Sequence, residues 1–180
     1  MKKLLMVISL VFLLCFTFGC QYQGAMAELE EFWAQAELEE QNKELKKRAW
    51  EAWGKGDFET YKELLAPDYV YYSPSRTTKP MSREETIEFG KMLHNDFPDI
   101  SWDIEELFAV EDRVIVRFIS SGTHEGEFQG IPATGNKVEI SGIMITRIEN
   151  GKLVEEREEF DMLGMMQQLG MELKPKEEEK

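Results

Sequence analysis

Two long hairpin patterns in the second half of the chain limit the folds that this sequence can adopt. Apolar and polar residues alternate over 100–122 and again over 137–160, with the period of two that is typical of β-strands. The first pattern is interrupted at Glu111-Asp112 and the second at Asn150-Gly151, a dipeptide that favours a two-residue hairpin turn. The sequence therefore predicts about four long antiparallel strands in this half.

The position of each turn predicts which side chains lie opposite one another. In the first hairpin Phe108 should face Ile115, and Glu106 should face Arg117, with Trp102 on the same side of the strands. A cross-strand ion pair is the simpler interpretation of Glu106 with Arg117, and a catalytic pair is the alternative.

The second hairpin is expected to place Met144 opposite Arg157, and continued alternation puts Asp161 on the same face. Glu156 and Phe160 fall on the other face. Apolar side chains occur on both faces, so the alternation leaves open which one lines the interior of the protein.

The first half of the chain has the pattern of helices. Leu45, Ala49 and Trp53 recur at four-residue intervals and form an apolar stripe, and Ser82 with Glu85 has the spacing of a helix-capping box. One short strand, DYVYY, separates these helices. Helices followed by a long antiparallel sheet predict an α+β domain in which the helices pack on one face of a curved sheet.

The first residues have the organisation of an export signal. Two lysines precede an apolar run that is too short to cross a membrane comfortably. The residues TFGC (17–20) resemble a bacterial lipobox and predict lipidation of Cys20. Ala25-Met26-Ala27 offers a secretory cleavage site instead, and an uncleaved anchor is the third option.

These signals predict both the domain organisation and the location of the protein. The expected segments are a signal peptide (1–19), an acidic spacer (20–40), the α+β domain (41–170) and a charged tail (171–180). The expected location is the extracytoplasmic side of the bacterial cell envelope, with a lipid anchor in the membrane. Cleavage after Ala27 would make it a secreted protein instead.

The charge and the cysteines exclude several classes of function. A net charge of −14 without a basic patch argues against nucleic acid as a partner. Beyond Cys20 the chain contains no cysteine, so the domain has neither a disulfide nor a cysteine nucleophile. Only His94 and His124 are present, which argues against a multi-histidine metal site.

The order of several motifs resembles that of a known family. NKELKKRAWEAWGKGD, GTHEGEF, NGKLVEE and DMLGMMQQLG follow one another as in the SnoaL-like polyketide cyclases, also called ester cyclases, of the nuclear-transport-factor-2-like superfamily. The resemblance covers 41–170 and implies a cone-shaped, curved antiparallel β-sheet that is packed by the N-terminal helices and encloses an apolar cavity. It also implies acid–base chemistry on a small hydrophobic carbonyl compound, such as ring closure by an intramolecular aldol reaction, with no cofactor and no metal.

Asp161 matches the carboxylate that acts as acid and base in this family. Burial in an apolar cavity would raise its pKa toward neutrality and make proton transfer effective in both directions. Capping of the following helix is the alternative role for an aspartate at this position, and the two roles can coexist. Two departures from the family pattern are Arg157, in place of a common tryptophan, and Tyr72, in place of a common histidine. Arg157 close to Asp161 would lower its pKa and oppose the role of a base.

His124 is the second candidate for catalysis, as a hydrogen-bond donor in the cavity, and a structural residue at a strand end is the alternative. The candidate ligand-binding side chains of the cavity wall are Trp53, Tyr72, Phe89, Trp102, Met144, Arg157 and Met165. Three functions fit the chain. They are an acid–base enzyme, a non-catalytic membrane-tethered protein that binds a small hydrophobic ligand, and a scaffold that forms a homodimer through the open face of its sheet.

Overall fold

The chain divides into two compact units, Met1–Leu38 and Glu39–Lys180. The computed structural model describes residues 2–74, 79–172 and 174, and for 2–22 it describes the backbone alone. The first unit is the N-terminal part of the long helix α1 (Lys2–Gly54). The predicted lipidation site Cys20 and the predicted signal peptide fall where side chains are not described, and most of the charged tail lies outside the described residues. Within the described residues, no helix combines the length and the apolar character needed to cross a membrane.

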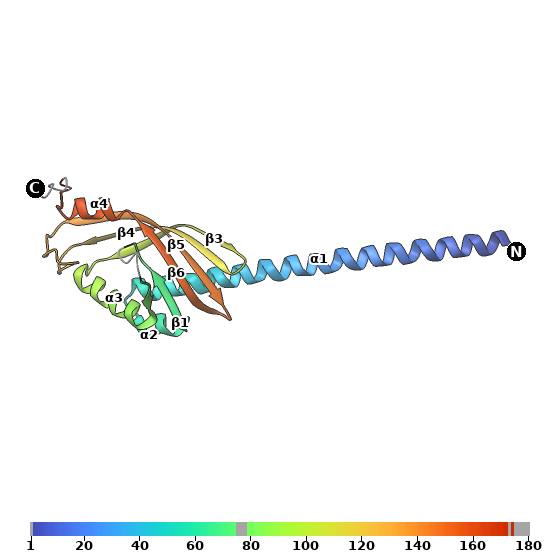
Figure 1. Ribbon diagram of the computed structural model, residues 1–180, viewed down its shortest axis with the longest axis horizontal. Coiled ribbons are helices and arrows are strands. Elements are labelled where there is room, and N and C mark those ends of the chain that lie inside the picture. The colour runs from blue at the N-terminus through green and yellow to red at the C-terminus, as the bar shows by residue number, and fades with distance from the viewer. Residues whose placement is uncertain (1, 75–78, 173, 175–180) are drawn as a thin grey trace, which may run out of the picture. The chain divides into compact units, whose positions relative to one another are not determined.

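A curved, six-stranded sheet forms the centre of the second unit (Figure 1). Its strands run in the order β2-β1-β6-β5-β4-β3 and are β1 (Leu65–Tyr72), β2 (Met81–Ser82), β3 (Ser101–Val110), β4 (Arg113–Thr123), β5 (Lys137–Glu149) and β6 (Lys152–Phe160). Neighbouring strands are antiparallel except β1 and β6, which run parallel. The predicted α+β class with a curved sheet is confirmed, and the parallel pair makes the sheet mixed rather than wholly antiparallel.

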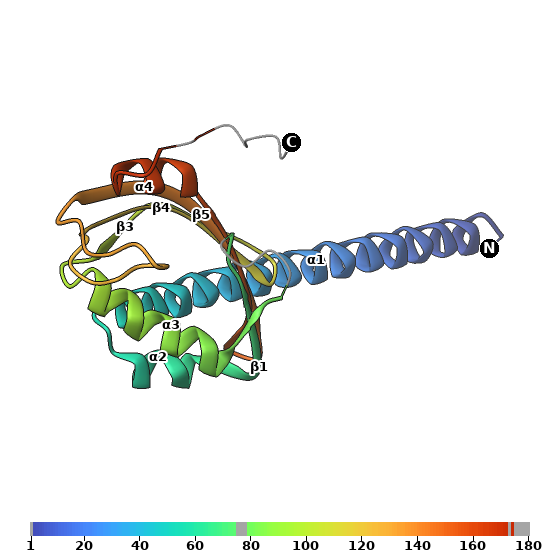
Figure 2. The same cartoon turned by 60° about the vertical axis from the view of Figure 1, so that its left-hand side comes forward.

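Three helical segments cover the concave face of the sheet (Figure 2), namely residues 39–54 of α1, α2 (Phe58–Leu64) and α3 (Arg83–Asp96). The capping box predicted at Ser82 and Glu85 begins α3. Gly90 lets α3 approach the other two helices closely, because a Cβ atom at this position would lie 2.5 Å from Phe58 and 2.7 Å from Trp53.

The last helix, α4 (Met162–Gln168), is fixed to the beginning of β5. The side-chain amide of Gln168 accepts a hydrogen bond from the Glu139 N–H at 2.8 Å and donates one to the Glu139 carbonyl at 2.9 Å. Met165 is buried in a second apolar cluster with Phe97 and Phe128. This cluster extends the apolar interior toward the C-terminal helix.

The β3–β4 hairpin has the predicted turn and the predicted pairing next to it. Glu106 lies opposite Arg117, and the two form an exposed ion pair. The register shifts between Ile104 and Glu106, and this turns Trp102 to the interior face. The prediction that Trp102 shares a face with Phe108, which is 55% exposed, is therefore wrong, because a β-bulge reverses the alternation.

The β5–β6 hairpin contains a second bulge that decides which side chains enter the interior. Asn150-Gly151 has the two positive φ values (51° and 69°) that the predicted tight turn requires. Beyond the turn, Val154 is an extra residue in the described ladder, and Met144 lies opposite Glu158 rather than the predicted Arg157. The prediction that Met144 and Arg157 share a face is wrong, because a shift of one residue turns every later side chain to the other side of the sheet.

Candidate functional site

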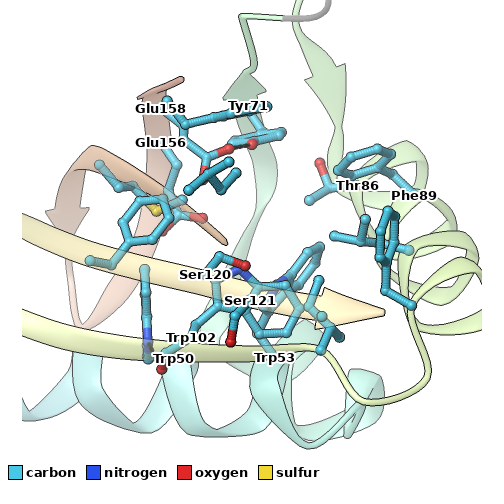
Figure 3. Close-up of a pocket in the computed structure, with 18 of the residues that line it drawn as sticks. Trp50, Trp53, Tyr71, Thr86, Phe89, Trp102, Ser120, Ser121, Glu156 and Glu158 are labelled. Carbon is cyan, nitrogen blue, oxygen red and sulfur yellow. Dashed lines mark hydrogen bonds between the residues drawn. The ribbon is translucent and has the colours of Figure 1, made fainter. Parts of the chain in front are cut away.

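A cavity lies between the concave face of the sheet and the helices α1, α2 and α3 (Figure 3). The part of the cavity that the centre of a water molecule can reach has a volume of about 90 Å³. This corresponds to roughly six to nine waters, or on the order of 200 Å³ of liquid. The wall is mainly aromatic and includes Trp50, Trp53, Phe89, Trp102, Phe118 and Phe160. The space therefore suits a small apolar molecule of one or two rings.

Glu156 is the centre of a buried polar cluster in the wall of this cavity. Its Oε2 accepts hydrogen bonds from the hydroxyl groups of Tyr61 at 2.8 Å and Tyr69 at 2.5 Å. Its Oε1 accepts a hydrogen bond from Thr146 at 2.9 Å and pairs with the ammonium group of Lys46. Burial alone would raise the pKa of Glu156, but the charge of Lys46 and the hydrogen bonds outweigh it and hold the pKa below its ordinary value. Glu156 is therefore ionised, and its cluster is a satisfied structural network.

Glu158, two residues further along β6, has a different environment. Its carboxyl group accepts a hydrogen bond from the Tyr71 hydroxyl and faces the cavity (Figure 3). Burial and the negative charge of Glu156 raise the pKa of Glu158 to about 7, against the lowering effect of the Tyr71 hydrogen bond. Burial also raises the pKa of Tyr71 well above its ordinary value, so its hydroxyl remains a donor. A carboxyl group with a pKa near neutrality in an apolar cavity can both take and return a proton.

Most of the predicted ligand-binding residues line the cavity, namely Trp53, Phe89, Trp102, Met144 and Met165. Tyr72 and Arg157 do not. They pair across β1 and β6, where the Arg157 guanidinium stacks on the Tyr72 ring at 3.9 Å and donates a hydrogen bond to Glu155 at 2.8 Å. The structure places both side chains outside the cavity, because strand alternation points Arg157 away from its neighbours Glu156 and Glu158.

Asp161 lies at the start of α4 with an exposed side chain. Its Oδ1 accepts a hydrogen bond from the Gly164 amide at 2.7 Å, so the predicted capping role is present. It is not among the residues that line the cavity, and Arg157 pairs with Glu155 rather than with Asp161. A catalytic role for Asp161 stays a prediction.

His124 is fully buried one layer behind the cavity. Its ring stacks on Phe97, a residue of the wall, with the ring centroids 5.1 Å apart. The Thr134 amide donates to Nδ1 at 3.3 Å, which leaves the proton of the neutral ring on Nε2. Within the part of the chain that is described, Nε2 has no hydrogen-bond partner. Its predicted role as a cavity donor stays a prediction.

Sequence reasoning does not find Lys46, Tyr71, Glu156 or Glu158. The signal for Lys46 is its place beside Leu45 in the apolar stripe of α1, which indicates a buried cation but not its partner. The two glutamates occupy alternate positions of one strand, but only the bulge decides that this face is the inner one. Among the described residues, no group of three or more His, Cys, Asp and Glu side chains is placed to hold a metal ion.

An open groove beside α3 shares Phe89, Leu93 and Phe128 with the wall of the cavity. Acidic residues of α3, among them Glu84 and Glu88, line the groove. Their charges favour the approach of neutral or cationic molecules over that of anions.

Comparisons with known proteins are consistent with this geometry. A sequence profile of the SnoaL-like polyketide cyclases matches residues 43–169. No curated protein matches the chain. Among solved structures, AclR from Streptomyces galilaeus, a candidate hydroxylase, is 28% identical, with a TM-score of 0.66 over 73% of this chain and 97% of that chain. IdmH from Streptomyces antibioticus, a candidate polyketide cyclase, is 29% identical, with a TM-score of 0.63 over 72% of this chain and 99% of that chain. A candidate SnoaL-like polyketide cyclase from a Jannaschia species is 23% identical, with a TM-score of 0.68 over 75% of this chain and 95% of that chain, and shows a likeness of fold alone.

Proposed function

Because the chain belongs to the SnoaL-like polyketide cyclase family, we propose that it is a cyclase-type enzyme that performs cofactor-independent acid–base chemistry on a small hydrophobic carbonyl compound. The observation that carries the proposal is Glu158, a cavity carboxyl group with a pKa of about 7. We assign the role of acid and base to Glu158 rather than to Asp161, whose exposed carboxylate is engaged as a helix cap. The similar structure IdmH is a candidate polyketide cyclase, which supports the same class of reaction.

In the proposed reaction, the ionised Glu158 removes a proton from the carbon next to the carbonyl group. The electron pair of the broken C–H bond forms an enolate, which attacks a second carbonyl carbon of the same molecule and closes a ring. The proton held by Glu158 then passes to the alkoxide that this attack creates. A pKa near 7 makes both proton transfers accessible at neutral pH.

The surrounding residues support this chemistry by holding Glu158 in place and setting its charge. The Tyr71 hydroxyl orients the carboxyl group through its hydrogen bond. The fixed negative charge of Glu156 raises the pKa of Glu158, and Lys46 keeps Glu156 ionised. The aromatic wall surrounds the reactive carbon with apolar groups, which limits quenching of the enolate by water.

The test is hydrogen–deuterium exchange at the carbon next to the carbonyl group of 1-tetralone, followed by proton NMR in D₂O. We expect the wild-type protein to accelerate exchange, with a rate that rises with pH through about 7 as Glu158 ionises. Glu158→Gln should abolish the acceleration. Tyr71→Phe should move the midpoint to higher pH, because it removes the hydrogen bond that lowers the pKa of Glu158.

Asp161→Asn is the matched control, since it removes a carboxylate and keeps a capping side chain. Loss of exchange in this variant, with exchange retained in Glu158→Gln, would overturn the assignment and give the catalytic role to Asp161. Binding of 1-tetralone without any exchange in the wild type would favour the non-catalytic ligand-binding function.

A further inference from the structure

The hydroxyl group of Ser120 is a polar group of the cavity that the proposed chemistry leaves without a role. Ser120 lies on the interior face of β4, is 6% exposed and lines the cavity (Figure 3). Its Oγ has no hydrogen-bond partner among the described residues, whereas the hydroxyl of the adjacent Ser121 is bonded to Ser101 at 3.1 Å. Because this hydroxyl opens on the cavity, it is free to form a hydrogen bond with a ligand, and a ligand that makes this bond gains affinity over one that leaves the hydroxyl unpaired.

Ser120 and Glu158 lie on opposite sides of β5 and at different heights along it. Ser120 pairs with Ile140, and Glu158 pairs with Met144, which is four residues further along the same strand. On a flat sheet, strands about 4.8 Å apart and a rise of about 3.4 Å per residue would separate the two Cα atoms by roughly 17 Å. Both side chains point to the concave side, where the curvature of the sheet brings them together, so the gap between their polar atoms lies between roughly 10 Å and roughly 17 Å.

We infer that the cavity binds a two-ended polar ligand, a bicyclic ketone whose carbonyl oxygen meets Glu158 and whose second oxygen, at the far end, meets Ser120. The inference rests on the proposed function, because it places the reacting carbonyl group at Glu158. A hydroxyl group both donates and accepts hydrogen bonds, so Ser120 accommodates either an alcohol or a second carbonyl group. Its effect is on the choice and orientation of the ligand and not on proton transfer.

The size of the cavity agrees with such a ligand. The space available is on the order of 200 Å³, which a bicyclic molecule fills. With a hydrogen bond of about 2.8 Å at each end, a bicyclic skeleton that carries an oxygen at both ends spans the gap between the two side chains. The wall between them is aromatic, including Phe118 and Trp102, and suits the ring system.

The experiment compares the affinities of three probes of one shape by titration calorimetry near pH 6, where Glu158 is protonated. The probes are tetralin, 1-tetralone and 6-hydroxy-1-tetralone. In the wild type, 1-tetralone should bind more tightly than tetralin, and 6-hydroxy-1-tetralone about 3- to 10-fold more tightly again. Ser120→Ala should abolish only the second gain and leave the melting temperature unchanged or higher. Ser121→Ala, which removes an already bonded hydroxyl of the same strand, should keep both gains.

Retention of the hydroxyl gain in Ser120→Ala, or its equal loss in Ser121→Ala, would overturn the inference. Failure of all three probes to bind would overturn it as well, because the cavity would then not accept a bicyclic ligand. Failure of the proposed function looks different. In that case both gains in affinity would remain in the calorimetry, while 1-tetralone would bind to the wild type without any exchange of its protons. A loss of the gain of 1-tetralone over tetralin would instead overturn the inference itself.

Discussion

Replacing Glu158 by glutamine should make the protein more stable at neutral pH, by an amount that depends on pH. Folding raises the pKa of Glu158 from its ordinary value of 4.5 to about 7, mainly through burial. Between these values the folded protein keeps a proton that the unfolded chain releases, so an increase in pH favours the unfolded chain. The stability associated with the protonated carboxyl group is complete below pH 4.5 and is lost as the pH rises to about 7.

The magnitude follows from the difference between the two pKa values. A difference of about 2.5 pH units (7 − 4.5) corresponds to about 3 kcal/mol, at about 1.4 kcal/mol per unit. Glutamine has the size of glutamate and an oxygen that accepts the Tyr71 hydrogen bond, but it does not ionise. The variant should therefore match the wild type near pH 4.5 and exceed its free energy of unfolding by about 3 kcal/mol above pH 7.

Urea unfolding of the two proteins from about pH 5 to pH 8, followed by circular dichroism, measures this difference. Subtraction of the two curves removes the contribution of other titrating groups that lie far from Glu158. Glu139→Gln, which removes an exposed carboxylate from the neighbouring strand β5, controls for the change in net charge. A difference between wild type and Glu158→Gln that is the same at pH 5 and pH 8 would refute the argument.

Lys46→Met should lower the free energy of unfolding by about 3–5 kcal/mol, because it leaves the buried carboxylate of Glu156 without its cation. In the same urea assay, the double variant Lys46→Met/Glu156→Gln should regain part of this loss. Asp161→Ala should lower the free energy of unfolding by about 1 kcal/mol through the lost helix cap, whereas Asp161→Asn should lower it less because asparagine also caps helices. Equal losses of stability for the two variants in thermal unfolding would contradict the capping role. Cys20→Ser should move the protein from the membrane fraction to the soluble fraction of lysed cells if Cys20 carries the proposed lipid anchor, and a wild-type protein that is itself soluble would contradict the anchor.

Turns and helix caps could be predicted from the sequence, because they depend on residues that are neighbours along the chain. The Asn150-Gly151 turn follows from the need for two residues that tolerate positive φ values. The caps at Ser82 and Asp161 follow from amides that lie within three residues of the capping side chain. Such local signals determine where helices and strands begin, and they give the α+β order of the elements.

The candidate site depends on interactions that the sequence does not reveal locally. The segment EEREE (155–159) supplies glutamates to both faces of β6, so its alternation carries no sign of which face is buried. Val154 decides the question by forming a bulge, yet an apolar residue at this position fits a regular strand equally well. Lys46 and Glu156 are separated by 110 residues, and the burial of each is explained only by the other.

The bulge at Val154 also affects the register in which β5 and β6 pair as the chain folds. A straight ladder from the Asn150-Gly151 turn would join the same strands one residue out of register, and EEREE would then supply Glu155 and Glu159 to the interior. At the position opposite Met144, between these two, the interior receives Glu158 in the bulged form and Arg157 in the straight form. A guanidinium group there would be desolvated among aromatic rings on the same side as the ammonium group of Lys46. The bulge therefore selects the register that keeps the Arg157 side chain exposed to solvent and gives the interior Glu158 and Phe160 instead of Arg157 and Glu159.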